Sequence, residues 1–201
     1  MAHVAGFILG GGESVRMGRD KALLDLDGMP LILRVARLLE PLTGRPKVIG
    51  QPDRFDSLDV NGVGDDQPGL GPLGAIATAL HHTDKTWNLI VGCDLPFLTN
   101  PWLEYLIQRA LHSSSDVVMP RSEGGFEPLC AMYHQRCEQA ISAALARGVR
   151  KVTDGLVDSR MEIIEPSEWK AFDSDGLLFK NMNSLADYEE VRSRLDQKRQ
   201  A

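Results

Sequence analysis

At 201 residues, the chain has the length of one domain with a sizeable core, and its ordinary composition requires no second domain. Its formal net charge of −6 argues against a surface that coats nucleic acid, because such a surface needs clustered lysine and arginine. Three cysteines without CxxC spacing indicate reduced thiols in a cytoplasmic protein, not a disulfide scaffold or a zinc site. There is no basic leader and no run of roughly 20 apolar residues, so neither secretion nor a membrane anchor is expected.

The first half of the chain alternates strand and helix patterns. An apolar run that breaks into glycines predicts a buried first strand at 4–9. The elements that follow are, in order, a helix opened by Pro30, a strand at 47–49, a helix from Pro72 to about Leu80, a strand at 87–93 and a helix from Asn100 to about His112. Proline marks the first turn of each helix, where its missing N–H costs nothing, and Asn100 is the expected N-cap.

The second half continues the alternation. In order, it contains strands at 116–120 and 129–133, a helix that Gly148 ends, a strand at 161–164 and a last helix opened by a capping box of Ser184 and Asp187. Strands that alternate with helices indicate a three-layer, Rossmann-like α/β domain with a mostly parallel central sheet. We expect this single domain to span 1–197, followed by a frayed tail at 198–201.

A glycine loop follows the first strand. Glycines at 10, 11 and 12 let backbone N–H groups close on a phosphate or a base without obstruction by side chains. Arg16 and Lys21 add positive charge suited to phosphoryl oxygens. Taken alone, the segment is as consistent with an ordinary glycine turn carrying solvated charges. It is neither a Walker A loop nor a dinucleotide fingerprint, because Gly18 is not followed by Lys-Ser/Thr and the third glycine would fall at Val15.

The segment LGGGESVRMGRDK, residues 9–21, resembles a known signature. The nucleotidyltransferases that make molybdenum cofactor guanine dinucleotide carry Leu-Ala-Gly-Gly-x-Ser-x-Arg-Met-Gly-x-Asp-Lys, and Gly10 here replaces the usual Ala. Four later blocks resemble the same family in the same order: DDQPGLGPLG at 65–74, CDLPF at 93–97, EPL at 127–129 and NMN at 181–183. The resemblance covers nearly the whole chain. It implies a nucleotidyltransferase domain that transfers GMP from GTP to the phosphate of molybdopterin and releases pyrophosphate.

The resemblance also implies roles for single residues. It assigns catalysis to Arg16, Lys21 and Asp94, and nucleotide binding to Leu9, Gly10, Gly11, Gly12, Lys21, Asp66 and Asp94. It assigns Mg²⁺ to Asp94 and the acceptor to Glu127, Pro128, Asn181 and Asn183. Asp94 also follows a buried strand, so its carboxylate should project from the carboxyl edge of the sheet, where ligands bind in open α/β folds. With the site empty, we expect Asp94 to lack a partner and Lys21 to be solvated.

Several alternatives stay open. Asp65 competes with Asp66 as the nucleotide contact, and Asn183 could form only a turn before the last helix. His81 and His82 fit a helix end better than metal ligation. Gly50 and Gln51 stand where the family often carries Asn, so a cytidylyltransferase that uses CTP remains possible, as does a non-catalytic accessory protein of the same fold. The expected partners are GTP, molybdopterin and, transiently, other cofactor-biosynthesis proteins or molybdoenzymes, with no nucleic acid and no membrane.

Overall fold

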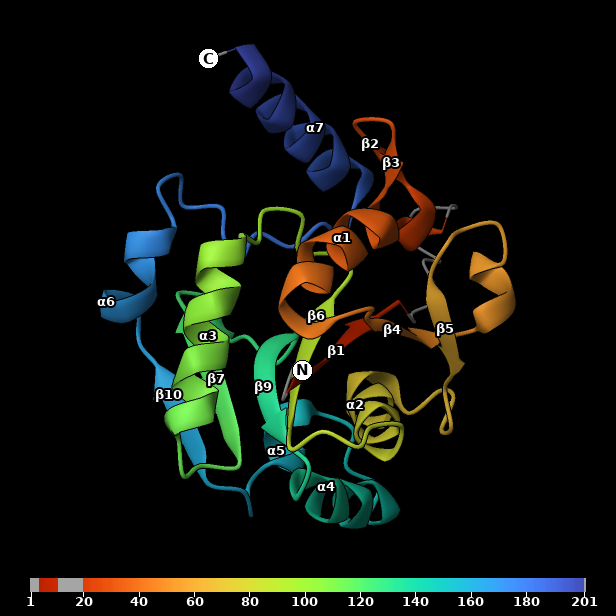
Figure 1. The fold of residues 1–201 in the computed structure, drawn as a ribbon, viewed down its shortest axis with the longest axis vertical. Helices are drawn as coiled ribbons and strands as arrows, with labels where there is room; N and C mark the ends of the chain where they lie inside the picture. Colours follow the sequence, from red (N-terminus) through yellow and green to blue (C-terminus); the bar gives the residue numbers. More distant parts are fainter. Residues whose placement is uncertain (1–3, 11–19, 201) are drawn as a thin grey trace.

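A computed structural model describes residues 4–10 and 20–200, with side chains as far as Leu195. Eight strands form one sheet, and helices lie on both of its faces (Figure 1). The strands are β1 (Val4–Leu9), β4 (Lys47–Gly50), β5 (Asn61–Gly64), β6 (Trp87–Gly92), β7 (Val117–Ser122), β8 (Gly125–Phe126), β9 (Cys130–His134) and β10 (Met161–Ile164). Their order across the sheet is β10-β7-β9-β6-β1-β4-β5, and β8 pairs with β7 outside this order.

The sheet is mostly parallel, as predicted. β4, β1 and β6 are parallel neighbours at its centre, and β5 and β10 each pair parallel with an adjacent strand. β9 runs antiparallel to both β6 and β7, and β8 forms an antiparallel hairpin with β7. The carboxyl ends of the parallel strands therefore meet at one edge.

Two apolar clusters fill the space between the sheet and its helices. Side chains of β6 alternate between them: Leu89 and Val91 join the cluster under α1 (Leu31–Thr43) and α3 (Asn100–His112), whereas Ile90 joins the opposite one. The opposite cluster is covered by α2 (Gly71–His81), α4 (Cys137–Ala146) and α5 (Val152–Gly155). This is the three-layer arrangement that the alternating pattern predicts.

A third, smaller cluster joins the last helix to the β2–β3 hairpin. The helix α7 (Leu185–Gln200) packs beside the hairpin of β2 (Asp25–Leu26) and β3 (Met29–Pro30), at the end of the molecule opposite α4 (Figure 1). Its buried members are Leu26, Leu31, Phe97, Met182, Val191 and Leu195. α7 is described as far as Gln200. The domain boundary at 197 and the frayed tail at 198–201 stay predictions.

Most predicted elements are confirmed, with small shifts. Thr99, not Asn100, is the N-cap of α3; Asn100 is the first helical residue, and its side-chain amide donates to the carbonyl of Leu38. Ser184 and Asp187 exchange hydrogen bonds before α7, as the capping box predicts. The unpredicted elements are β2, β3, β5, β8 and the short helices α5, α6 (Pro166–Trp169), η1 (Lys21–Leu23), η2 (Pro52–Phe55) and η3 (Lys170–Phe172).

The cysteines agree with a further expectation. All three cysteines are buried free thiols, and burial raises the pKa of Cys93 and of Cys130 to about 12, which makes both unreactive. Among the described residues, no helix combines the length and apolar character needed to cross a membrane.

Candidate active site

The candidate site lies where the central strands β1 and β6 end side by side. Leu9, the last residue of β1, pairs with Gly92, the last residue of β6. The Cys93 amide donates to the Leu9 carbonyl (3.3 Å), and the Gly10 amide donates to the carbonyl of Ile49 in β4 (3.0 Å). Backbone bonds therefore continue past the ends of the strands and bring the start of the glycine loop next to the segment that carries Asp94.

Three predicted site residues meet here although they are far apart in the chain. The Lys21 ammonium donates to Asp94 Oδ2 (3.0 Å) and to Asn183 Oδ1 (2.9 Å). The side chains of Lys21 and Asp94 are only 19% and 17% exposed, so water screens this ion pair little. The Lys21 ammonium thus holds two side-chain oxygen atoms, from segments far apart in the chain, next to each other.

Two backbone features position Asp94 and Asn183. A Cβ at Gly92 would lie 2.6 Å from Asp94 Oδ1, so the carboxylate occupies space that only glycine leaves open. The Asp94 carbonyl accepts from the Met182 amide (3.0 Å), which places the next residue, Asn183, beside Asp94. The amides of Asn183 and Ser184 donate to the Asp187 carboxylate at the start of α7. Asn183 therefore belongs both to the helix-capping turn and to the site.

Lys21 is positioned through the residue before it, Asp20, whose side chain makes two contacts that nothing in the sequence indicated. Asp20 caps η1 by accepting from the Ala22 amide (3.1 Å), and its other oxygen accepts from Arg54 Nε (2.8 Å). Arg54 lies in η2, 34 residues further along the chain, and stacks on the ring of Phe55. An arginine in a short surface turn carries no sequence signal, so only the fold reveals that it fixes the residue before Lys21.

The predicted acceptor residues lie along the same edge. The Gly92 amide donates to the Leu129 carbonyl (2.8 Å), which ties the segment of Glu127 and Pro128 to the end of β6. Glu127 accepts from the Ser122 hydroxyl (2.6 Å), and its pKa is raised by burial and then by the nearby negative charge of Asp94. Asn181 is exposed and lies one residue before Met182. The structure thus brings Glu127 and Asn183 near Asp94, with Pro128 in the segment tied to β6, while Asn181 is exposed.

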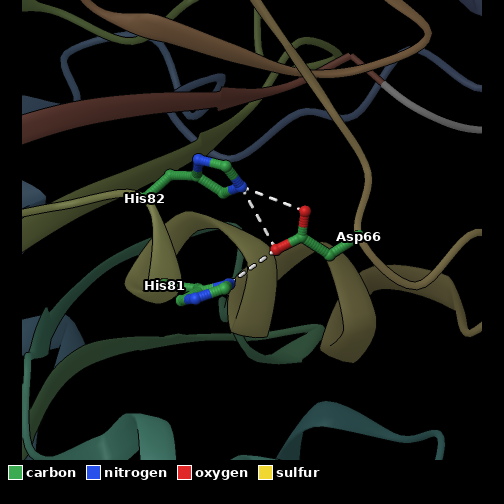
Figure 2. Close-up of side chains that lie close together, drawn as sticks. All are labelled: Asp66, His81 and His82. Carbon is green, nitrogen blue, oxygen red and sulfur yellow. Dashed lines mark hydrogen bonds and ion pairs between the residues drawn. The ribbon is translucent and has the colours of Figure 1, made fainter.

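The two candidate aspartates of the β5–α2 loop lie against α2. Asp65 accepts from the hydroxyl of Thr78 (2.9 Å) and the amide of Gln67, which holds the loop on α2. The Asp66 carboxylate lies against His81 and His82 at the end of α2 (Figure 2). A nucleotide contact at Asp66 remains a prediction.

The glycine loop is described only in part. Gly11, Gly12 and Arg16 lie outside the described residues. Gly10 is buried, and a Cβ there would lie 3.0 Å from Val48 Cγ1 and 3.1 Å from Phe55 Cζ. The glycine that replaces the usual Ala therefore fits a tightly packed position.

Two expectations about the empty site are wrong. Lys21 is not solvated, and Asp94 does not lack a partner, because the two pair with each other. The physical reason is that a partly buried carboxylate is costly unless it is paired, and among the described residues Lys21 is the cation that pairs with it.

The oxygen donors suit a hard divalent cation. Mg²⁺ prefers one or two carboxylates, with waters and phosphate oxygens completing its shell. Asp94 Oδ2 and Asn183 Oδ1 already contact a positive charge, and the partly buried Glu127 adds negative charge nearby. The residues present therefore fit the expected ion.

Known proteins resemble this chain over most of its length. A family model described as the MobA-like NTP transferase domain matches residues 6–161. A probable molybdenum cofactor guanylyltransferase of Natronomonas pharaonis is 33% identical over 210 residues, covering 97% of this chain and 100% of the relative. A protein of the same name from Synechococcus elongatus is 33% identical and covers 94% and 98%, respectively. In fold, the chain matches the crystal structure of molybdopterin-guanine dinucleotide biosynthesis protein A from Archaeoglobus fulgidus with a TM-score of 0.85, at 22% identity and with 96% and 99% coverage.

Proposed function

Since this chain belongs to the family of MobA-like NTP transferase domains, we propose that it transfers GMP from GTP to the phosphate of molybdopterin and releases pyrophosphate. Relatives that match nearly its whole length bear the name molybdenum cofactor guanylyltransferase. The observation that carries the proposal is the convergence of Lys21, Asp94 and Asn183 at the edge where β1 and β6 end. These residues combine a phosphate-binding cation with oxygen donors for a metal.

The reaction needs alignment and charge stabilisation more than covalent chemistry by the protein. A phosphate oxygen of the acceptor attacks the α-phosphorus of GTP in line, and the bond to the bridging oxygen of the leaving pyrophosphate breaks. Lys21 stabilises the negative charge that builds on the phosphoryl oxygens, and Arg16 is proposed to assist it. Asp94 and Asn183 would hold Mg²⁺, which would supply positive charge to the phosphates and to the leaving group.

Lys21 has a second role before substrate arrives. It lies between Asp94 and Asn183, the two residues that would hold a divalent ion. When the nucleotide binds, Lys21 moves from these oxygens to the phosphates. Asp94 and Asn183 would then be free to hold the ion, whose charge would spare the partly buried Asp94 carboxylate the cost of lacking a partner.

The acceptor is proposed to lie against Glu127 and Pro128, on the other side of Asp94 from the glycine loop. The attachment of this segment to the end of β6 supports the placement. The nucleotide is proposed to contact the loop from Leu9 to Gly12, and GTP and Mg²⁺ are the proposed substrate and cofactor. We propose that the protein works in the cytoplasm and meets other cofactor-biosynthesis proteins or molybdoenzymes transiently.

A nucleotide panel tests the proposal. Purified protein is incubated with Mg²⁺, molybdopterin and GTP, CTP or ATP, and pyrophosphate release is measured. We expect release with GTP in preference to the others. Preferred release with CTP would assign the chain to cytidylyl transfer, and the presence of Gly50 and Gln51 near the expected base makes that comparison essential. Binding without release for every nucleotide would indicate an accessory protein and overturn the proposal.

A further inference from the structure

A second cluster of metal-ligating side chains lies outside the Lys21–Asp94 site. His81 Nδ1 is 2.8 Å from Asp66 Oδ2, and His82 Nε2 is 3.0 and 3.1 Å from the two Asp66 oxygens. The three potential ligand atoms all lie within 4.8 Å of one another. Figure 2 shows both imidazole rings turned toward the same carboxylate.

The fold holds the backbone of these residues in place independently of the contacts between their side chains. The Asp66 amide donates to the Thr78 hydroxyl (3.1 Å), and that hydroxyl donates to Asp65 (2.9 Å). His81 is the last residue of α2 and His82 is its C-cap, so the helix end positions both rings. Pre-positioned ligands lower the ordering cost of binding an ion.

We propose that Asp66, His81 and His82 form a binding site for a divalent transition metal ion such as Zn²⁺, Co²⁺ or Ni²⁺. Two imidazole nitrogens and one carboxylate favour these ions, whereas Mg²⁺ prefers oxygen ligands. Three protein ligands leave coordination positions open, and the exposed position of the cluster lets water fill them. The site therefore differs in metal preference from the one proposed at Asp94.

Without a metal ion, hydrogen bonds join the two histidines to Asp66. Hydrogen bonds from His82 and His81 lower the pKa of Asp66, and the bond to Asp66, supported by the charge of Glu138, raises the pKa of His81. A ring nitrogen that donates to Asp66 must give up that proton, or move it to its other nitrogen, before it binds a metal. A bound metal ion would thus replace the protons that now link the histidines to the Asp66 carboxylate.

The two histidines of the cluster lie away from the nucleotide edge, whereas Asp66 follows the carboxyl end of β5 by two residues. α2 connects the carboxyl end of β5 to the beginning of β6, so its last residues return toward the amino edge of the sheet. The His82 carbonyl accepts from the ammonium of Lys47, the first residue of β4. Asp94, in contrast, follows the carboxyl end of β6. The two histidines can therefore be changed without changing the segment that carries Asp94.

Calorimetric titration of the intact, nucleotide-free chain with Zn²⁺ alone tests the proposal. We expect one Zn²⁺ per chain, bound more tightly than Mg²⁺, with Co²⁺ giving visible absorption bands of nitrogen- and oxygen-bound metal. His81→Ala and His82→Ala should each weaken Zn²⁺ binding about tenfold or more, since even outer-shell partners cost about 10–100-fold. His112→Ala, which removes an exposed histidine at the end of α3, is the matched control and should bind normally.

Two further measurements keep the outcome interpretable. Thermal unfolding in a chelator establishes that each variant folds, and added Zn²⁺ should raise the melting temperature of the wild type but not of His82→Ala. Asp94→Asn should retain Zn²⁺ binding, so the result does not depend on the proposed transferase activity. Zn²⁺ binding that survives in a His81→Ala/His82→Ala double variant, or that is lost in His112→Ala, would overturn the proposal.

Discussion

Lys21 is the residue in which the resting and the working state of the site differ most. In the structure it neutralises Asp94 and binds Asn183, and in the proposed reaction it binds phosphate. Lys21→Ala should lower kcat/KM by a factor that corresponds to about 2–4 kcal/mol of lost transition-state stabilisation. The reason is that the contact between Lys21 and phosphate strengthens as charge develops. Steady-state pyrophosphate release measures the loss. Full activity in this variant would show that the glycine loop and its lysine are not part of the catalytic site.

Asp94 links the proposed metal to the stability of the empty protein. In Asp94→Asn, turnover should collapse and the remaining activity should require much more Mg²⁺, because the neutral amide attracts the ion weakly. The stability of the empty protein should fall by about 1–2 kcal/mol, since Lys21 loses its carboxylate partner. Denaturant unfolding and an Mg²⁺ titration of activity measure both effects. Normal turnover with unchanged Mg²⁺ dependence would place the metal elsewhere.

Glu127 gives a pH-dependent prediction. Its pKa in the folded protein is raised above the ordinary 4.5, first by burial. At pH values between the ordinary pKa of 4.5 and the raised pKa of the folded protein, the folded state binds more protons than the unfolded state. The free energy of unfolding therefore falls as the pH rises through this window. Glu127→Gln removes the charge but can still accept from Ser122. The variant should melt at a higher temperature than the wild type at pH 7, and the difference should disappear at a pH below 4.5.

At the scale of the element, the end of β6 determines where Asp94 points. A methyl group at Gly92 would meet Asp94 Oδ1 at 2.6 Å and Leu129 Cβ at 3.3 Å. Gly92→Ala should destabilise the fold by about 1–3 kcal/mol through overpacking. It should also reduce turnover by about 100-fold, as expected for a displacement of about 1 Å. Both are measured against Gly64→Ala, another strand-terminal glycine, whose Cβ would meet nothing within 4 Å and whose stability should change little.

How far the elements could be predicted depended on how much apolar side chain each one buries. β1 and β6 are almost entirely buried and stand out as apolar runs, so their ends, and with them Asp94, were predictable. β5 reads NGVG and is mostly exposed at the edge of the sheet, so it carried no hydrophobic pattern. Its position follows from pairing with β4, which is a long-range contact that no local pattern encodes.

The candidate site was predictable in its residues but not in its contacts. Lys21, Asp94 and Asn183 were recognisable because each lies in a motif of its own. That Lys21 would bridge the other two was not, because the pairing spans 73 and 162 residues. Arg54 and the approach of Asp66 to His81 were missed for the same reason: each depends on how a loop settles on a distant element.

At the scale of the whole molecule, the third apolar cluster attaches the last helix to the hairpin that follows Lys21. Met182 is fully buried in this cluster and lies next to Asn183. Met182→Ala should lower the free energy of unfolding by about 2–5 kcal/mol, with reduced turnover because Asn183 loses its support. Leu185→Ala is the control: Leu185 is 60% exposed, and the change should stay within about 0.5 kcal/mol. Equal stability of the two variants would show that the last segment is not anchored by this cluster.

The residues of the site lie far apart in the chain, so the ribosome adds them at different times. A ribosome adds Asn183 162 residues after Lys21, which is roughly 8–30 s later at a synthesis rate of about 5–20 residues per second. During that interval the nascent chain can assemble β1, β4 and β6 and can pair Lys21 with Asp94, but it has no Asn183 to complete the group. We therefore expect each new molecule to become competent only after Asn183 has been added, long after its central strands have formed.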